Sequence, residues 1–294
     1  MSGESPVEVS VIVPCYRAGK FLPRFVAALK AQDFTGRWEA VFVDDGDPEG
    51  ESAYACVDDS RFRVVRRPHA GVSAARNAGL AATSGEIVLF ADPDDEPGPS
   101  WMTHLVRGLD GVDLAWAGCT VHEGGAGRRL VPEDVGAVYR GEAVRRRAWR
   151  SVFGYRLRDV LRWWTPQRLW RGCRRELGSA CWRAFRRSVL GDLRFDESLA
   201  LYEDAVFVSA YAARAGSMRI LGDADYVYFI RFTGGMSVGN REHKAAAKFA
   251  LRDARQRLDP ARRFWRGTFW LSAAEVAREA GLGAAWRYLT GGKL

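Results

Sequence analysis

Short apolar runs alternate with helical patterns along the first hundred residues of the chain. Val9 to Val13, Trp38 to Val43 and Glu86 to Ala91 have the apolar character and the length of buried strands. Between them, Phe21 to Ala31 and Val72 to Ala82 place apolar or small side chains at helical spacing. Strands that alternate with helices are typical of βαβ units, so the pattern predicts an α/β fold around a parallel sheet.

Weaker patterns extend this order through the rest of the chain. The further expected elements are strands at Arg63 to Val65 and Leu114 to Gly118, helices at Trp101 to Leu109 and Glu203 to Ala215, a strand pair within Arg219 to Arg231, and a helical tail from Arg241. We expect Pro14 to end the first strand, and Gly124 to Gly127 to form a hairpin loop.

Polar side chains gather where the predicted strands end. In open α/β sheets, ligands bind beyond the carboxyl ends of the strands, at the point where the strand order reverses. The residues that we expect to meet at this edge are Tyr16, Asp44, Asp45, Asp92, Asp94 and Asp95.

Several ionised carboxylates within a few Å repel one another unless a cation or a shared proton lies among them. The chain offers no His or Cys pair with metal-ligand spacing, and oxygen ligands alone favour Mg²⁺ or Mn²⁺. These ions keep positions open for waters and substrate phosphates, so we expect a phosphate or diphosphate ester as the substrate. The alternative is an Asp-rich turn that only caps the helix at Trp101.

The composition fits a globular protein with one large α/β domain, or one domain with a smaller appendage. The chain has 294 residues, and 47% of them are apolar. It shows neither a secretion signal at its start nor an apolar run near the roughly 18 residues of a membrane span, so we expect a cytoplasmic protein. The five cysteines are scattered, as reduced thiols would be, and no dinucleotide or P-loop motif follows the first strand.

The formal charge of +8 is concentrated in one window. Between Arg140 and Arg187 there are fifteen arginines and only three acidic residues. The same window contains Trp149, Trp163, Trp164, Trp170 and Trp182. Arginine mixed with tryptophan is typical of a membrane-surface helix or a polyanion site, and a basic helical face with buried indoles is the equal alternative.

Four segments carry motifs that can be recognised. They are VSVIVPCYRAGKFLPRFVAAL at 9–29, VFVDDGD at 41–47, AGVSAARNAGLAATSGEIVLFADPDD at 70–95, and the segment from ACWRAFRR to AARAG at 180–216, in which Glu203 and Asp204 open a helix. These segments resemble the inverting family 2 glycosyltransferases, which have the GT-A fold, and the third is the most specific match. Arg17, Asp47 and Pro93 depart from the family pattern, which has Asn, Ser and Ser at these positions.

The resemblance implies how the chain would hold a nucleotide. Asp45 would accept a hydrogen bond from a uracil or thymine ring, and Pro14 and Tyr16 would form the opposite wall of the base pocket. Arg76 would face the phosphates, where a guanidinium and a helix N-terminus both favour an anion. Arg231 lies in a glycine-rich segment that would close over the diphosphate.

The resemblance also assigns the remaining carboxylates. Asp92 would lie near the ribose, and Asp94 would bind the Mn²⁺ or Mg²⁺ that bridges the diphosphate, with Asp92 and Asp95 as further metal ligands and Asp95 as the substitute for Asp94. Asp204 would be the base that activates the acceptor hydroxyl, and Glu203 would orient the acceptor or act as the alternative base. Without the resemblance, acids that complement a helix dipole would be the simpler explanation of these two residues.

The resemblance divides the chain into three parts. Residues 1–120 would form a nucleotide-sugar-binding GT-A half, residues 121–240 an acceptor-binding and catalytic half with a basic helical insertion at about 140–178, and residues 241–294 a C-terminal helical region. It implies a UDP- or dTDP-sugar donor and a hydroxyl acceptor, lipid-linked or polymeric, in bacterial cell-surface polysaccharide or glycoconjugate synthesis. An anionic membrane surface and a second copy of the chain are further expected partners.

Three other functions remain open on the sequence alone. A metal-dependent nucleotidyltransferase or phosphotransferase would use the same acidic cluster, and the departures at Arg17, Asp47 and Pro93 would suit a catalytically inactive nucleotide-sugar-binding scaffold. A nucleic-acid-binding protein is the least favoured, because the acidic residues would repel a phosphate backbone and no nucleic-acid-binding motif occurs in the basic window.

Overall fold

The computed structural model describes residues 6–123, 125–153, 178–230, 241–258 and 266–293. The strands are β1 Val9–Cys15, β2 Trp38–Asp44, β3 Phe62–Arg66, β4 Ile87–Phe90, β5 Glu96–Pro97, β6 Leu114–Glu123, β7 Ala126–Leu130, β8 Val138–Arg140, β9 Arg183–Arg186 and β10 Ser217–Ile230. The helices are α1 Leu22–Lys30, η1 Gly50–Tyr54, α2 Val72–Ala82, α3 Trp101–Gly108, α4 Glu142–Phe153, α7 Arg187–Leu190, α8 Glu203–Arg214, α9 Arg241–Leu258 and α10 Arg266–Thr290.

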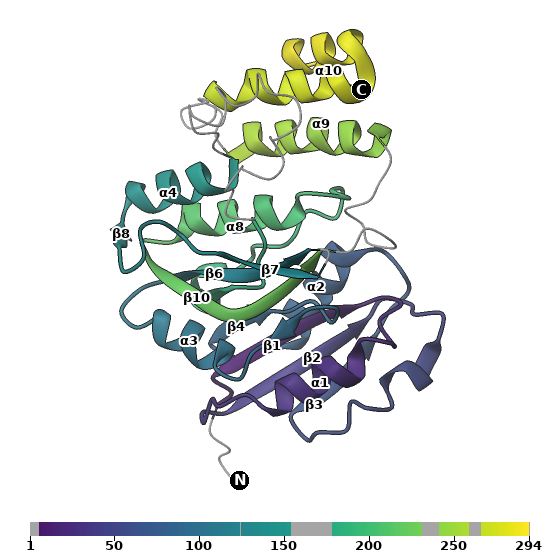
Figure 1. Ribbon diagram of the computed structural model, residues 1–294, viewed down its shortest axis with the longest axis vertical. Coiled ribbons are helices and arrows are strands. Elements are labelled where there is room, and N and C mark those ends of the chain that lie inside the picture. The colour runs from purple at the N-terminus through teal and green to yellow at the C-terminus, as the bar shows by residue number, and fades with distance from the viewer. Residues whose placement is uncertain (1–5, 124, 154–177, 231–240, 259–265, 294) are drawn as a thin grey trace.

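One sheet runs through the molecule in the strand order β3-β2-β1-β4-β9-β6-β10-β5 (Figure 1). The first four strands in this order are parallel, as the βαβ pattern predicts. β9 is antiparallel to both of its neighbours, while β6 and β10 are parallel to each other. The sheet is therefore mixed, and β9 joins the N-terminal strands to the strands that follow α3.

Helices cover both faces of this sheet (Figure 1). Val9, Val11 and Val13 of β1 belong to the core that includes α1 and α3. Ile12, which points to the other face, belongs to the core that includes α4 and α8. Successive side chains of a strand point to opposite faces, so the unbroken apolar run of β1 follows from burial on both sides.

Two expectations about strands differ from the structure. β1 continues through Pro14 to Cys15, because β2 still pairs there while β4 pairs only as far as Ile12. The expected strand pair within Arg219 to Arg231 is wrong, since Ser217–Ile230 is one long strand with two register shifts against β6. Residues 222–225 lie in the bulged part of this strand, and Asp225 has a positive φ of 57°.

Other expectations are confirmed in whole or in part. Gly124 to Gly127 was expected to be a hairpin loop, and β6 and β7 do pair antiparallel, but Ala126 and Gly127 already belong to β7; residue 124 lies outside the described residues. The tail from Arg241 contains α9 and α10, which pack on each other through a small separate core. Within the described parts of the chain, no helix is both long and apolar enough to cross a bilayer.

The described part of the basic window packs into the protein. Trp149 and Trp182 are buried, and the Arg183 guanidinium stacks on the Trp116 ring at 3.8 Å. Arg186 donates to the carbonyls of Leu109 and Val112, both at 2.7 Å. The two indoles are buried, as the alternative of a basic helical face with buried indoles predicts, whereas Arg183 packs into the core instead of a solvated face and Arg146 of α4 remains exposed. Residues 154–177, which include Trp163, Trp164 and Trp170, lie outside the described residues.

Candidate active site

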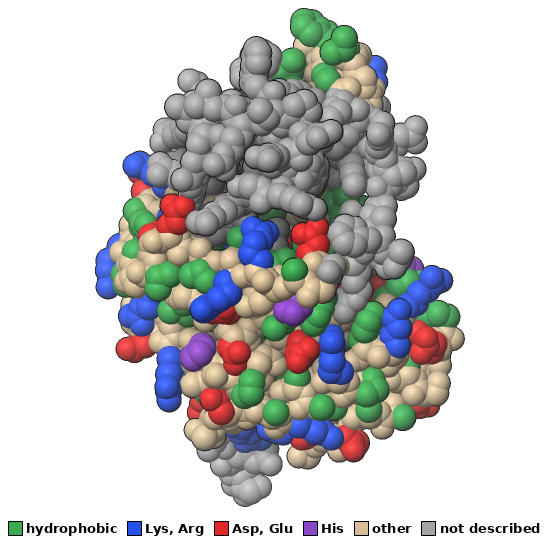
Figure 2. Space-filling model, viewed as in Figure 1, with side chains coloured by type: hydrophobic (Ala, Val, Ile, Leu, Met, Phe, Trp, Pro, Cys, Tyr) green, Lys and Arg blue, Asp and Glu red, His purple; other side chains and the backbone are tan. Residues whose placement is uncertain are grey.

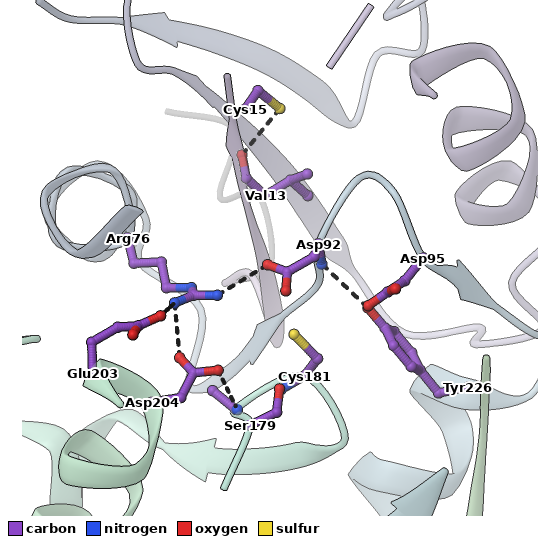
Figure 3. Close-up of polar contacts among 11 residues, drawn as sticks. Val13, Cys15, Arg76, Asp92, Asp95, Ser179, Cys181, Glu203, Asp204 and Tyr226 are labelled. Carbon is purple, nitrogen blue, oxygen red and sulfur yellow. Dashed lines mark hydrogen bonds and ion pairs between the residues drawn. The ribbon is translucent and has the colours of Figure 1, made fainter. Parts of the chain in front are cut away.

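The candidate site lies where β4 and the start of α8 meet α2. Asp92 follows β4, Glu203 and Asp204 are the first two residues of α8, and Arg76 projects from α2 (Figure 3). α2 can reach this position because its residues are small. A Cβ on Gly79 would lie 2.3 Å from Ile12 Cγ2 of β1, so only glycine allows the helix to lie this close to the sheet.

Arg76 joins the acid that follows β4 to the two acids at the start of α8 (Figure 3). Its Nη2 donates to Asp92 Oδ1 at 3.0 Å. Its Nη1 donates to Glu203 Oε1 at 3.1 Å and to Asp204 Oδ1 at 2.8 Å. The Arg76 side chain is 3% exposed. A buried guanidinium with this many carboxylate partners neutralises much of their mutual repulsion.

Burial perturbs both acids of α8. Burial and the neighbouring Asp204 charge raise the pKa of Glu203 to about 7, against the opposing effect of Arg76. Burial also raises the pKa of Asp204 above its usual value, against the opposing effect of Arg76. The second Asp204 oxygen accepts the backbone N–H of Ala180 at 3.2 Å, and Ser179 adds a side-chain hydrogen bond. Perturbed carboxylates with fixed partners are typical of catalytic acids and bases.

The acidic residues after β4 form a second group around Tyr226. Ligand atoms of Asp92, Asp95 and Cys181 all lie within 4.8 Å of one another. The Tyr226 hydroxyl donates to Asp95 Oδ2 at 2.9 Å, and the Phe229 N–H donates to Asp95 Oδ1 at 3.1 Å. Burial, together with the charges of Asp92 and Asp94, raises the pKa of Asp95 well above its usual value.

This second group fits a divalent cation that prefers oxygen ligands. Asp92 and Asp95 offer carboxylate oxygens, and a cation would relieve the repulsion that raises the Asp95 pKa. Cys181 fits Mg²⁺ less well, because a thiol is a soft ligand and burial raises its pKa well above the usual value. Asp94 is half-buried, and its backbone carbonyl accepts a hydrogen bond from Arg24 Nη2 at 3.2 Å.

The residues expected around the base lie at the ends of β1 and β2. Tyr16 is 42% exposed and stacks on His69, with ring centroids 4.1 Å apart. Pro14 is buried within β1. Asp45 is buried and already accepts hydrogen bonds from the N–H groups of Ala70 and Gly71, at 3.1 and 2.7 Å.

The Asp45 carboxylate also contacts Arg67 Nη1 at 3.1 Å and His69 Nδ1 at 2.8 Å. A carboxylate has about four acceptor positions. The hydrogen bond of His69 Nδ1 goes to the Asp45 backbone carbonyl at 3.0 Å, so a base N–H would share the Asp45 carboxylate with the Arg67 side chain and two backbone N–H groups. His69 thus contacts both Tyr16 and Asp45. The sequence gave no reason to select His69, because a single His without a paired partner carries no motif.

The departures from the family pattern have local structural consequences. Arg17 has a φ of 52°, a left-handed conformation that Asn tolerates better than Arg. The Asp47 carboxylate accepts the backbone N–H groups of Ala18 at 3.1 Å and Glu49 at 3.0 Å, and so ties the turn after β2 to the loop after β1. Pro93 is buried between Asp92 and Asp94.

Further residues at the site were not selected from the sequence. Cys181 was classed with the scattered thiols but lies beside Asp92 and Asp95. Asn77 exchanges two hydrogen bonds with the Phe195 backbone, at 2.8 and 3.0 Å, and so ties α2 to the segment before α8. The motif that contains Arg76 also contains Asn77, and the segment that begins ACWRAFRR contains Cys181, but the sequence gave no specific role to either residue. Arg231 lies outside the described residues.

The arrangement can hold an anion near a cation site and place a carboxylate beside it. Asp92 belongs to the group that fits a cation, and Asp204 lies on the opposite side of the Arg76 guanidinium (Figure 3). A carboxylate with raised pKa can accept a proton from a hydroxyl, and a cation stabilises negative charge on a departing phosphate.

Solved structures share the fold. The crystal structure of S. aureus TarS 1–349 in complex with UDP covers 92% of this chain and 71% of its own, with a TM-score of 0.59 and 19% identity. The mannosyltransferase PcManGT from Pyrobaculum calidifontis, in complex with GDP-Man and Mn²⁺, covers 98% of this chain and 82% of its own, with a TM-score of 0.54 and 18% identity. At these identities the likeness shows the fold alone, and it confirms the expected GT-A architecture.

Curated relatives match at higher identity. The chain is 28% identical over 225 residues to the uncharacterized glycosyltransferase EpsJ of Bacillus subtilis (strain 168), which covers 75% of this chain and 60% of EpsJ. It is 29% identical over 134 residues to the uncharacterized glycosyltransferase YibD of Escherichia coli (strain K12), which covers 43% of this chain and 39% of YibD. The chain therefore spans less than two thirds of the length of these relatives.

A family model matches across both halves of the sheet. Residues 10–194, more than half of the chain, match the model described as glycosyl transferase family 2. The matched range contains Arg76 and Asp92, and the acids of α8 follow shortly after it. The chain belongs to glycosyl transferase family 2.

Proposed function

We propose that this protein is an inverting glycosyltransferase that moves a sugar from a nucleoside-diphosphate sugar to an acceptor hydroxyl. The observation that carries the proposal is the cluster in which Arg76 links Asp92, beside the candidate cation site, to Asp204 at the start of α8. A cation site for a diphosphate next to a buried carboxylate base is what such a transfer requires.

Asp204 is the proposed base. It would take the proton of the acceptor hydroxyl as that oxygen attacks the anomeric carbon, and attack opposite the leaving diphosphate inverts the configuration of that carbon. The Ala180 N–H and Arg76 hold the Asp204 carboxylate from two sides, which fixes its orientation. Glu203 shares Arg76 and would orient the acceptor.

Asp92, Asp94 and Asp95 are the proposed ligands of a divalent metal ion, Mn²⁺ or Mg²⁺. When bound, such an ion stabilises the negative charge that develops on the leaving diphosphate. Asp92 and Asp95 already converge in one group, and Asp94 lies between them in the sequence on the same turn. Mn²⁺ is present in the complex of the similar fold PcManGT with GDP-Man, which supports the proposal.

A uridine or thymidine diphosphate sugar is the proposed donor. Tyr16 offers an exposed ring for a base, with Pro14 behind it and Asp45 nearby, and complexes of the similar fold TarS contain UDP and UDP-GlcNAc. The base would share the Asp45 carboxylate with its present donors, which are the Arg67 side chain and the backbone N–H groups of Ala70 and Gly71. Arg231 remains a proposed diphosphate ligand.

The proposed acceptor is a lipid-linked or polymeric hydroxyl compound of a bacterial cell-surface polysaccharide or glycoconjugate, which places the enzyme peripherally on the cytoplasmic face of the membrane. Cytoplasmic leaflets are anionic and attract basic segments. Residues 241–294 contain twelve Lys and Arg and five Asp and Glu, and Leu282 and Trp286 of α10 are 83% and 68% exposed. Hydrophobic side chains reach the surface at the tip formed by α10 (Figure 2).

Binding of nucleoside diphosphates with and without Mn²⁺, followed by thermal shift, tests the proposal. The nucleoside diphosphate with the preferred base should raise the melting temperature of the wild type, and it should do so only when Mn²⁺ is present. Asp94→Ala should lose this stabilisation, while Asp204→Asn should keep it and lose sugar transfer by about 10³-fold or more, as expected when a positioned base is removed.

Equal loss of nucleotide binding in both variants would contradict the assigned roles. The two alternative functions give different results. A nucleotidyltransferase or phosphotransferase would release a product other than a nucleoside diphosphate from the sugar nucleotide, and an inactive scaffold would bind the nucleotide sugar without any turnover.

A further inference from the structure

We propose that Arg76 is a positioning residue for Asp204, rather than a ligand of the donor diphosphate. The inference rests on the proposed function, because it names what holds the base of that reaction in place. It differs from the role that the sequence implies for Arg76, which is to face the phosphates.

The hydrogen bonds of the Arg76 guanidinium to described residues all go to carboxylates. Nη2 donates to Asp92 at 3.0 Å, while Nη1 serves Glu203 at 3.1 Å and Asp204 at 2.8 Å. A planar guanidinium can serve acids on two sides at once because its donors are fixed in a fork. The ammonium group of lysine is a single point of charge and cannot span the same acids.

The guanidinium is closed to an incoming ligand. The Arg76 side chain is 3% exposed, and its Nε has no hydrogen-bond partner among the described residues yet lies beneath the surface. A diphosphate could reach these N–H groups only if Asp92, Glu203 or Asp204 moved away. The contacts with the acids would then be lost when the base is needed.

Contacts other than those with the acids also fix the position of Arg76. The Phe195 ring lies 5.3 Å from its guanidinium carbon, and Phe195 itself stacks on Phe207 of α8 at 3.8 Å. Asn77, the next residue of α2, exchanges two hydrogen bonds with the Phe195 backbone. α2 and α8 are therefore joined twice, through Asn77 and through Arg76, and the guanidinium has a defined position.

The other side of Asp204 is held as well. Its Oδ2 accepts the Ala180 N–H at 3.2 Å, and the preceding carbonyl of Ser179 accepts a hydrogen bond from the buried Arg183. Asp204 thus lies between a backbone segment that Arg183 anchors and a guanidinium that Phe195 and Asn77 anchor. Arg76 is the member of this set that also contacts the donor side, through Asp92.

Steady-state kinetics of Arg76→Gln and Arg76→Lys separate positioning from donor binding. A base displaced by about 1 Å can cost about 10²-fold in rate. We expect Arg76→Gln to lower kcat by about 10²-fold, and Arg76→Lys to recover part of this loss because it keeps a charge beside Asp204. The donor KM and the Mn²⁺-dependent Kd for the nucleoside diphosphate should each change by less than about threefold, since the proposal gives Arg76 no contact with the donor.

A double-mutant cycle with Asp204→Asn tests whether Arg76 acts through the base. In that background Arg76→Lys should lower the residual rate no further, because two residues that act as one unit are not additive. Turnover can be followed as release of nucleoside diphosphate with water as the acceptor. Arg187→Lys is the matched control, since Arg187 is a partly buried arginine that bonds Gly85 O and Thr83 Oγ1, and it should leave kcat and KM unchanged.

The outcomes are distinguishable. A rise of tenfold or more in donor KM and Kd with kcat retained would make Arg76 a phosphate ligand and overturn the inference, and so would additive losses in the double-mutant cycle. If Arg76→Gln does not fold by circular dichroism, Arg76→Lys decides alone. A wild type that neither binds nucleotide nor turns over a sugar nucleotide would overturn the proposed function, and this inference with it.

Discussion

Arg76 supplies the positive charge that lets the acids of this site lie together. The sequence predicted that a metal carrying a diphosphate would sit among the carboxylates after β4. In the structure a side-chain cation already links Asp92 to Glu203 and Asp204, while Asp95 points to Tyr226 in a separate group that fits a metal. The acids of α8 therefore need no metal to be tolerated, whereas Asp92 and Asp95 still offer converging carboxylate oxygens to one.

Glu203 gives this cluster a measurable pH dependence. Its pKa rises from 4.5 to about 7 in the folded protein. Between these two pH values the folded state holds a proton that the unfolded state has released, so the free energy of unfolding falls as pH rises through this window. The side chain of Glu203→Gln does not titrate. The fall in the free energy of unfolding that Glu203 causes across this window, up to about 3 kcal/mol, should therefore be absent in the variant.

Urea unfolding at pH 4.5, 6, 7 and 8 measures the effect. The free energy of unfolding of the variant, relative to that of the wild type, should be lowest at pH 4.5. It should increase as the pH rises to about 7 and then stay level toward pH 8. Glu142→Gln is the control, because Glu142 is exposed and paired only loosely with Arg146, at 3.9 Å. Parallel pH curves for the wild type and Glu203→Gln would contradict the prediction.

At the scale of elements, α2 decides where the site forms. Its bounds, Val72–Ala82, agree with the sequence pattern, because the small-residue run is unbroken and Gly71, with a φ of 95°, starts it. The pattern could not show that Gly79 lets the helix lie against β1 and that Asn77 then ties it to Phe195, since both contacts join segments far apart in the sequence. The long strand β10 shows the opposite case, in which the pattern predicts a strand pair and pairing with β6 keeps one strand.

Gly79→Ala tests the close approach of α2 to β1. The new methyl group would overlap Ile12, at a cost of about 1–3 kcal/mol, against a gain in helix propensity of up to about 1 kcal/mol. We expect a net loss of about 1–2 kcal/mol in the free energy of unfolding and lower transfer activity, because Arg76 lies one turn away on the same helix.

Gly283→Ala is the matched control for this change. A Cβ on Gly283 meets no atom within 4 Å, so the variant should be neutral or up to about 1 kcal/mol more stable. Urea midpoints of the two variants give the comparison. Equal shifts in both would show that the contact with Ile12 carries no cost.

At the scale of the whole molecule, basic residues are concentrated in two segments of the chain. The window from 140 to 187 has a net charge of +12 and residues 241–294 a net charge of +7, although the whole chain has only +8. Their described helices, α4, α9 and α10, lie at the same end of the molecule, away from β1, β2 and β3 (Figure 1). α9 and α10 belong to the basic segment 241–294, and a basic end of the molecule suits an anionic surface.

Vesicle co-sedimentation tests the membrane contact of this end. The wild type should bind vesicles of phosphatidylcholine and phosphatidylglycerol, bind less at higher salt, and not bind pure phosphatidylcholine. The double variant Leu282→Ala and Trp286→Ala should bind the anionic vesicles about tenfold more weakly, because it loses two apolar side chains from α10.

Val135→Ala is the control for the loss of an exposed apolar side chain elsewhere, since Val135 is 53% exposed in the loop before β8. It should bind as the wild type does. Binding that ignores lipid charge, or that is unchanged in the double variant, would contradict a membrane contact through α10.

The sequence by itself determined the α/β order, the bounds of α2 and α8 within a residue or two, and the acids that enter the site, because these depend on local periodicity and on short motifs. Only the tertiary structure decided which cation those acids share, that Asp45 already contacts Arg67, His69 and two backbone N–H groups, and that Cys181 lies beside Asp92 and Asp95. These contacts join residues from distant segments, and burial sets both their partners and their pKa values. A linear pattern of hydrophobic and polar positions carries neither kind of information.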